Sequence, residues 1–311
     1  MKFVRAFAPA TVANVCCGFD ILGFAIEDQG DEVEVRLSGT PGVKMIKITG
    51  DDGKLPLDAD RNTCSVAVLS YLKALGKTVD IDITLNKKLP LGSGMGSSAA
   101  SAAAALVAIN RLMGDPMTRK ELVPHAMEAE RIACGTGHAD NVAPAILGGF
   151  VLIRDYHPLD LREVSFPREL CCVLVHPHLE VKTEDSRRIL RNSVTIRDAV
   201  SQSANAAGLM IGLMTSDFEL IGKSLKDAIA EPVRSVFIPG FDQLRTVAKD
   251  SGALGCGISG SGPTVFALCN DISIAKKVGE RIVEHFGLSH LKSDLIVSRV
   301  NADGAKVISK E

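Results

Sequence analysis

The sequence predicts an α+β protein of two domains, and three observations support this class. The chain has 311 residues, which is about twice the length of a typical single domain. Segments with strand-like alternation and segments with helical periodicity are interleaved along the chain. A stretch of mixed polarity with two prolines, Asp155–Pro167, separates the two halves. We therefore expect domains at residues 1–157 and 158–311.

The first half alternates strands with helices. Period-two alternation predicts strands at Lys2–Phe7, Asp31–Leu37, Val43–Thr49, Val79–Asn86 and Gly148–Asp155. Helical patterns cover Asn62–Leu75, Ser97–Met113 and Thr118–Ala133. Thr118 followed by Glu121 three residues later is a capping-box pattern, which indicates where the third of these helices begins.

The second half has a simple order once its extra helices are set aside. Strands are expected at Leu170–His176, Ala253–Ser259, Thr264–Leu268 and Asp294–Val300. Helices are expected from Thr183 to about Lys226, at Phe241–Ser251 and at Ile272–Phe286. The resulting βαββαβ order predicts a ferredoxin-like domain.

Composition excludes several classes of protein. The formal net charge is −2 and no long basic run occurs, which argues against nucleic-acid binding. No apolar run reaches the roughly 18 residues of a membrane span, and the N-terminus has no apolar region typical of a signal peptide. Eight cysteines lack a C-x-x-C motif, and Cys134 and His138 have no second pair with which to hold a metal. We expect a cytoplasmic protein with reduced thiols.

A glycine-rich segment is the main candidate for a ligand site. It reads Pro90, Leu91, Gly92, Ser93, Gly94, Met95, Gly96, Ser97, Ser98, Ala99 and Ala100. Three glycines at alternate positions let backbone N–H groups approach a ligand, and the following helix N-terminus favours an anion. No lysine follows the glycines, so the segment is not a P-loop, and its G-x-G-x-G spacing is not a dinucleotide fingerprint. We predict that it holds the phosphates of a nucleotide; the alternative is a plain flexible turn before a helix.

A second glycine-rich stretch satisfies a dinucleotide motif only formally. Gly255, Gly257 and Gly260 match G-x-G-x-x-G. However, a helix precedes them and the strand Thr264–Leu268 follows, which reverses the strand–loop–helix context that the motif requires. The dinucleotide interpretation therefore fails.

Three segments together resemble a known family. Pro90-x-x-x-Gly94-x-Gly96-Ser97-Ser98-Ala99 resembles the second motif of the GHMP kinases, which are named for galactokinase, homoserine kinase, mevalonate kinase and phosphomevalonate kinase. The stretch Pro9-Ala-Thr-Val-Ala-Asn14-Val-x-x-Gly18-Phe-Asp20-x-Leu-Gly23 resembles the first motif in its homoserine kinase form. Gly255-x-Gly-x-Ser259-Gly-Ser-Gly262-Pro-Thr resembles the third. Cys16 and Cys17 replace a common Gly-Pro, which puts only the shape of that loop in question.

The resemblance implies a fold and a phosphoryl donor. It implies a ribosomal S5 domain 2-like N-terminal domain, a ferredoxin-like C-terminal domain, and an active site between them. ATP would be the donor, with Asn62 at the adenine and Ser259 and Gly260 beside the nucleotide. Ser98 and Glu130 would bind Mg²⁺, which prefers oxygen ligands. Taken from the sequence alone, Asn62 is only a helix cap, and Glu130 is a surface charge beside Glu128 and Arg131.

The resemblance also implies an amino-acid acceptor, L-homoserine. It places Asn141 at the acceptor hydroxyl and His138 near the substrate, with Asp140 as an alternative general base. Acceptor contacts are implied for Thr183, Arg187, Arg234, Asn14 and Asp20. Guanidinium groups bind carboxylates bidentately, so the two arginines suit the acceptor carboxylate, while Asp20 and Asn14 suit its amino group. A mevalonate or sugar kinase and a non-catalytic nucleotide sensor are the rival interpretations. The resemblance further implies a homodimer.

Overall fold

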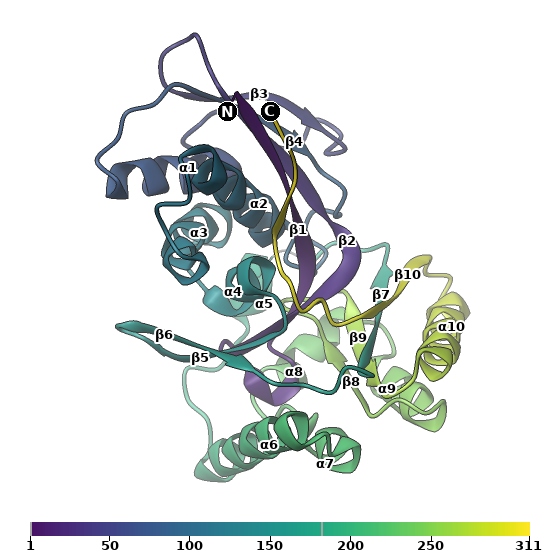
Figure 1. Ribbon diagram of the computed structural model, residues 1–311. Coiled ribbons are helices and arrows are strands. Elements are labelled where there is room, and N and C mark those ends of the chain that lie inside the picture. Colours follow the sequence, from purple (N-terminus) through teal and green to yellow (C-terminus); the bar gives the residue numbers. More distant parts are fainter. Residues whose placement is uncertain (1, 182) are drawn as a thin grey trace.

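The computed structural model describes residues 2–181 and 183–311, and the side chains of Cys134 and Thr183 lie outside the described part. Two α+β domains pack against each other (Figure 1), so the predicted fold class is confirmed. In the described part of the chain, no helix has both the length and the apolar character needed to cross a membrane.

The first domain is built on a seven-stranded sheet. Its central path has the order β11-β1-β2-β4-β3, and the hairpin β5–β6 extends it from β2. The strands are β1 (Phe3–Ala13), β2 (Leu22–Leu37), β3 (Val43–Thr49), β4 (Ile81–Asn86), β5 (Phe150–Tyr156), β6 (Leu159–Val164) and β11 (Lys306–Lys310). Strand β4 alternates buried and half-buried positions, which is the pattern of a sheet with one covered face.

Four helices cover that face. They are α1 (Thr63–Ala74), α2 (Ser97–Leu112), α3 (Arg119–Cys134) and α4 (Ala139–Leu147). Helix α2 contacts β1 and β2 and is buried over almost its whole length. Its run of alanines explains this position, because small side chains allow a helix to approach a sheet closely on one side and its neighbouring helices on the other.

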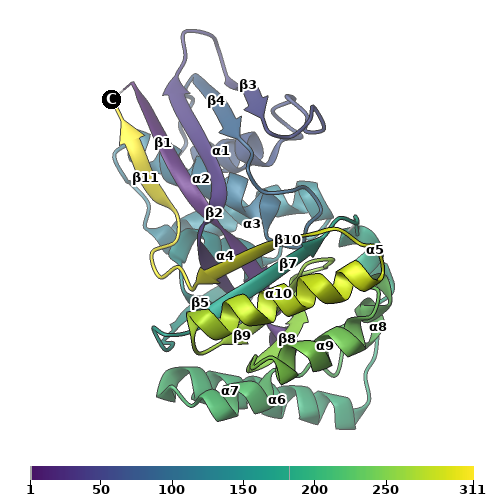
Figure 2. The same ribbon diagram turned by 90° about the vertical axis from the view of Figure 1, so that its right-hand side faces the viewer.

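The second domain has a four-stranded antiparallel sheet of order β10-β7-β9-β8. Its strands are β7 (Cys171–Pro177), β8 (Gly255–Ile258), β9 (Val265–Cys269) and β10 (Ser293–Arg299). This is the strand order of a ferredoxin-like domain. Its helices are α5 (Thr183–Arg188), α6 (Ile196–Thr215), α7 (Phe218–Ser224), α8 (Glu231–Arg234), α9 (Phe241–Asp250) and α10 (Ile272–Leu288). Figure 2 shows α9 and α10 packed over one face of the sheet.

The other face of this sheet joins the core of the first domain. Phe24 on β2 stacks on Phe150 of β5 with ring centroids 4.6 Å apart, and meets Phe266 of β9 edge-on at 6.3 Å. All three rings are fully buried. Aromatic contacts of this kind stabilise an interface by more than their buried area alone. The three rings therefore stabilise the contact between the two domains.

Two strands beyond residue 157 belong to the first sheet, although the sequence suggested a boundary there. Strand β6 pairs with β5 (Figure 1), and β11 pairs with β1 (Figure 2). Both are short edge strands with mixed or exposed side chains, so neither has the regular apolar alternation by which strands are predicted from sequence. The apolar pattern of the sequence therefore predicted neither β6 nor β11.

Candidate active site

A cavity of about 340 Å³ lies at the junction of the two domains. Residues of α1, α2, α3, α4, α5 and α8 line it, together with residues of the loops that follow β1, β3, β4 and β8. The predicted site residues in its wall are Asn14, Asn62, Leu91, Gly92, Ser93, Gly94, Gly96, Ser97, Ser98, Glu130, His138, Asp140, Asn141, Arg187, Arg234 and Gly260.

Of the other predicted residues, those that the structure describes in full do not line the cavity. Asp20 makes an ion pair with Arg187, which does line the cavity. Thr183 opens helix α5, and its side chain lies outside the described residues. The others belong to the loop or its supports and do not line the cavity: Pro90, Met95, Ala99, Ala100 and Ser259.

The glycine-rich loop has the conformation that its sequence predicts. Gly92, Gly94 and Gly96 have φ of 62°, 79° and 64°, which is the left-handed region that glycine enters without a steric penalty. Gly96 is the N-cap of α2. Among the described residues, no side chain caps this helix end, so its first N–H groups are available to an anion.

The third motif braces this loop. Ser259 Oγ donates to the carbonyl of Gly94 at 2.7 Å, and a Cβ on Gly94 would lie 2.5 Å from the Ser259 carbonyl oxygen. Asn14 Nδ2 donates to the carbonyl of Gly260 at 2.8 Å, while its Oδ1 accepts from the Asp20 N–H at 3.0 Å. Asn14 therefore ties the first motif to the third, and both ends of its amide are already engaged.

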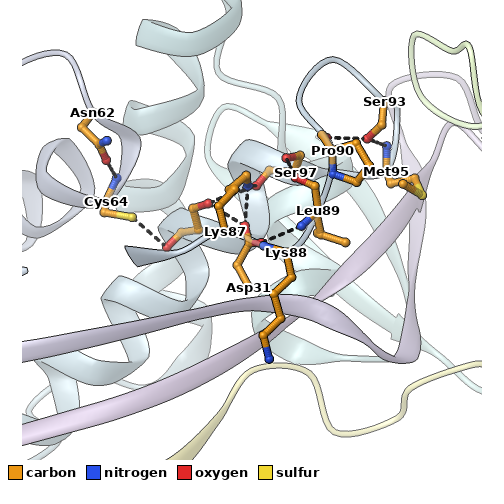
Figure 3. A network of polar contacts seen from close by, with 11 residues as sticks. Asp31, Asn62, Cys64, Lys87, Lys88, Leu89, Pro90, Ser93, Met95 and Ser97 are labelled. Atoms are coloured by element: carbon orange, nitrogen blue, oxygen red, sulfur yellow. Dashed lines mark hydrogen bonds and ion pairs between the residues drawn. The ribbon is translucent and has the colours of Figure 1, made fainter. Parts of the chain in front are cut away.

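A buried network beneath the loop was not found from the sequence. Lys87 Nζ donates to the Asp31 carboxylate, to the Ser97 carbonyl at 2.6 Å and to Ser101 Oγ at 2.9 Å (Figure 3). The other oxygen of Asp31 accepts from the N–H groups of Lys88 and Leu89 at 2.9 and 3.1 Å. The network holds the chain entering the loop against the first turn of α2. Asp31 had been identified only as the start of a strand.

Asn62 acts as a helix cap in this structure. Its Oδ1 accepts from the Cys64 N–H, and its Nδ2 donates to the Pro56 carbonyl, both at 3.0 Å. The side chain still lines the cavity together with Leu55 and Pro56. Contact with an adenine ring remains a prediction, and the apolar atoms of Leu55 and Pro56 would favour it.

Two residues of the cavity lining, Arg187 and His138, lie beside the carboxylate of Asp20. Arg187 donates through Nη2 and Nη1 to the two carboxylate oxygens of Asp20 at 3.0 and 3.3 Å. His138 Nδ1 lies 3.8 Å from the same carboxylate. Burial lowers the pKa of His138, so the imidazole is neutral near pH 7 and its ring can accept as well as donate a hydrogen bond.

Arg234 is an almost fully buried cation of the site, with 3% of its surface exposed. Its Nε and Nη1 donate to the carbonyls of Ser186 and Gly260 at 3.3 and 3.1 Å, and its guanidinium stacks on Phe19 at 5.0 Å. Burial and the charge of Arg187 lower the pKa of Arg234. A carboxylate bound here would relieve the repulsion between the two guanidinium groups.

Helix α4 brings two polar groups to the cavity in its first turn. Asp140 is almost fully buried, and burial, with the nearby negative charge of Asp20, raises its pKa to about 7. Asn141 lines the cavity, and its Oδ1 accepts from Thr11 Oγ1 at 2.7 Å. Thr11 was not identified as a site residue, although it lies inside the first motif.

Ser98 and Glu130 supply the oxygen atoms expected of a magnesium site. Ser98 is in the first turn of α2, and Glu130 is on α3 with 6% of its surface exposed. No cluster of three or more histidine, cysteine, aspartate or glutamate side chains that could hold a metal occurs among the described residues. Mg²⁺ in nucleotide sites is typically held by one or two protein oxygens together with phosphate and water.

The fold and the site define a phosphotransferase of the GHMP kinase type. The family model for the GHMP kinases N terminal domain matches residues 62–149, and the model for the C terminal domain matches residues 209–288. A homoserine kinase from Chlorobium phaeobacteroides is 52% identical over 99% of this chain and 100% of its own length. A homoserine kinase from Arabidopsis thaliana is 42% identical over 98% of this chain and 85% of its own length. The crystal structure of homoserine kinase from Cytophaga hutchinsonii superposes with a TM-score of 0.96 at 52% identity, covering 99% of this chain and 98% of that one.

The chain belongs to the homoserine kinases of the GHMP kinase family. Membership implies the use of ATP. The resemblance that the three motifs suggested is thereby confirmed at the level of the family.

Proposed function

We propose that the chain transfers the γ-phosphoryl group of ATP to the hydroxyl of L-homoserine, giving ADP and O-phospho-L-homoserine for threonine biosynthesis. One observation carries the proposal. A single cavity brings together an uncapped helix N-terminus behind a glycine-rich loop and two guanidinium groups, and a carboxylate paired with one of these groups lies beside it. The first feature suits phosphates, and the others suit the two charged ends of an amino acid.

On the donor side, phosphates would lie along the loop and against the start of α2. Backbone N–H groups at a helix N-terminus stabilise negative charge. Ser98 and Glu130 would hold Mg²⁺, which when bound neutralises phosphate charge that builds up during transfer. The braces from Ser259 and Lys87 keep the loop in place before the nucleotide arrives.

On the acceptor side, the carboxylate of homoserine would bind Arg234 and Arg187. Its amino group would meet Asp20, whose carboxylate lies at the site but is only half-buried. Asn14 is a weaker candidate for the amino group, because its Oδ1 already accepts the Asp20 N–H. His138 is the N-cap of α4 and lies beside Asp20, where it would contact the bound homoserine.

The acceptor hydroxyl would lie next to Asn141. In a largely dissociative transfer the hydroxyl proton can leave late, so Asn141 would orient the hydroxyl and no general base is required. One observation favours Asp140 as an alternative base: its pKa of about 7 suits proton uptake at neutral pH. The two routes differ in the effect of Asp140→Asn. Late proton loss predicts a kcat within about tenfold of the parent, whereas a base predicts a loss of about 10²–10⁴.

The substrate assignment is tested with analogues that each lack one charged end. 4-Hydroxybutyrate has no amino group, and 3-amino-1-propanol has no carboxylate. With ATP and Mg²⁺, ³¹P NMR should detect phosphorylated product from L-homoserine at far lower acceptor concentration than from either analogue. Equal turnover of all three would mean that neither the arginines nor Asp20 recognise the acceptor, and the proposal would be wrong.

A homodimer and a cytoplasmic location also belong to this proposal. The homodimer is implied by the family resemblance, and the location is predicted from the cysteine content. Light scattering coupled to size-exclusion chromatography would give a mass near twice the 32.9 kDa of the chain. A mass equal to that of one chain at micromolar concentration would contradict the dimer.

A further inference from the structure

Thr11 on β1 contacts Asn141, the residue that we place next to the hydroxyl of the acceptor. Thr11 Oγ1 donates to Asn141 Oδ1 at 2.7 Å. Thr11 is fully buried, whereas Asn141 is half-buried and lines the cavity. The two residues are 130 positions apart in the sequence, so the contact joins the central sheet to the first turn of α4.

The backbone around Thr11 is held in place. Its N–H donates to the carbonyl of Met95 at 3.1 Å, which ties β1 to the glycine-rich loop. The pairing of β1 with β2 shifts register between Pro9 and Thr11, and irregularities of this kind re-aim side chains beside functional sites. The direction of the Thr11 hydroxyl is therefore set by the sheet and the loop together.

The loop also packs directly on this pair of side chains. A Cβ on Gly96 would lie 2.0 Å from Thr11 Oγ1 and 2.8 Å from Asn141 Oδ1. Such distances are far below van der Waals contact, so only glycine fits at this position. The loop that would bind phosphate, the strand and the helix carrying Asn141 thus meet at one point.

The orientation of the Asn141 amide decides what it can do. An asparagine amide has one accepting end, Oδ1, and one donating end, Nδ2. The Thr11 hydroxyl engages Oδ1, which leaves the N–H groups of Nδ2 for a ligand. The γ-phosphoryl oxygens and the acceptor oxygen carry negative charge or lone pairs, so they need a donor. A turned amide would instead place Oδ1 against them.

We propose that Thr11 is a positioning residue for Asn141: its hydroxyl fixes the amide with Nδ2 toward the reacting oxygens. The inference rests on the proposed role of Asn141 at the acceptor hydroxyl. Fixed donors aimed at developing charge lower the barrier because they need no reorganisation during the reaction. Thr11 would therefore act on turnover more than on binding.

The test uses Thr11→Val, which keeps the shape of the side chain and removes its hydroxyl. We expect kcat to fall about tenfold or more, while the KM values for ATP and L-homoserine change less than about threefold. Thr11→Ser keeps the hydroxyl and should restore kcat to within about threefold of the parent. Thermal unfolding of each variant reports whether the fold is intact.

A double variant separates positioning from a general structural effect. If Thr11 acts through Asn141, then Thr11→Val should cause no further loss of kcat in an Asn141→Ala background. Thr49→Val is the matched control, because Thr49 Oγ1 also donates to an asparagine Oδ1, that of Asn86, at 3.2 Å on β3 and β4 outside the cavity. It should leave kcat and both KM values unchanged.

The kinetic results separate the role of Thr11 from the proposed role of Asn141. An impaired Asn141→Ala with an unimpaired Thr11→Val would overturn the positioning role and leave the role of Asn141 standing. Additive losses in the double variant would also overturn it, since they indicate a structural effect. An unimpaired Asn141→Ala would remove Asn141 from the reaction, and the inference with it.

Discussion

Replacing Lys87 by methionine should destabilise the protein strongly and loosen the phosphate loop. Only 1% of the Lys87 side chain and none of the Asp31 side chain is exposed. Methionine fills similar space but leaves the Asp31 carboxylate buried without its counter-charge. Removing one partner of a buried ion pair typically costs about 3–5 kcal/mol. Ser101 and two backbone N–H groups still donate to Asp31, so we expect a loss near the lower value, about 3 kcal/mol.

A second substitution tests whether the bare charge causes this loss. Asp31→Asn removes the charge and keeps an oxygen that can accept from Lys88 and Leu89. The Lys87→Met/Asp31→Asn double variant should therefore recover a large part of the stability lost in Lys87→Met. Lys88→Met is the matched control: its partner is Glu32, the Lys88 side chain is 47% exposed, and the loss should stay below about 1 kcal/mol.

Urea unfolding gives the stabilities, and initial rates give the KM for ATP. Lys87→Met should also raise this KM, because Lys87 Nζ holds the Ser97 carbonyl at the start of α2. A free-energy change below about 1 kcal/mol for Lys87→Met, or equal losses for Lys87→Met and Lys88→Met, would refute the reasoning.

Three further predictions concern the cavity itself. Arg234→Ala should raise the KM for L-homoserine about 10–100-fold by loss of a charged hydrogen bond and change the KM for ATP little; equal effects in initial-rate measurements would remove Arg234 from the acceptor site. Glu130→Ala should lower kcat and shift the Mg²⁺ titration of the rate to higher concentration, and an unchanged titration would count against a metal-binding role. The pKa of Asp140 is raised by burial from 3.8 to about 7, so the folded state loses stability as pH rises through this interval. Asp140→Asn abolishes that loss, and its unfolding free energy relative to the parent should be higher at pH 8 than at pH 5 by about 2 kcal/mol; a pH-independent difference in urea unfolding would contradict the raised pKa.

Local patterns were sufficient for the features that depend on neighbours in the sequence. The glycine-rich loop was recognisable because positive φ at alternate positions demands glycine. The capping box of Thr118 and Glu121 is present as predicted. The βαββαβ order was readable mainly because β7 and β9 carry continuous apolar runs.

Features that depend on distant contacts could not be predicted. Asp31, Lys87 and Ser101 meet only because β2, the end of β4 and α2 lie side by side. Thr11 approaches Asn141 through the packing of β1 against α4. In the sequence, Asp31, Lys87 and Ser101 are polar residues with no spacing that distinguishes them from solvated ones.

Asn14 and Asn62 show a related limit of prediction from sequence. The family resemblance assigned Asn14 and Asn62 to ligands, and in the structure the oxygen and the nitrogen of each amide already make one internal hydrogen bond. A residue can therefore be part of a site's motif because it holds the loops together. Only the hydrogen-bond partners in the folded chain reveal this.

The most direct test of the proposed reaction is a coupled assay of ADP release with four acceptor conditions. The purified chain, ATP and Mg²⁺ would be incubated with L-homoserine, mevalonate, galactose or no acceptor. We predict rapid ADP release with L-homoserine and background rates in the other three. A rate with L-homoserine no higher than the blank would contradict the account.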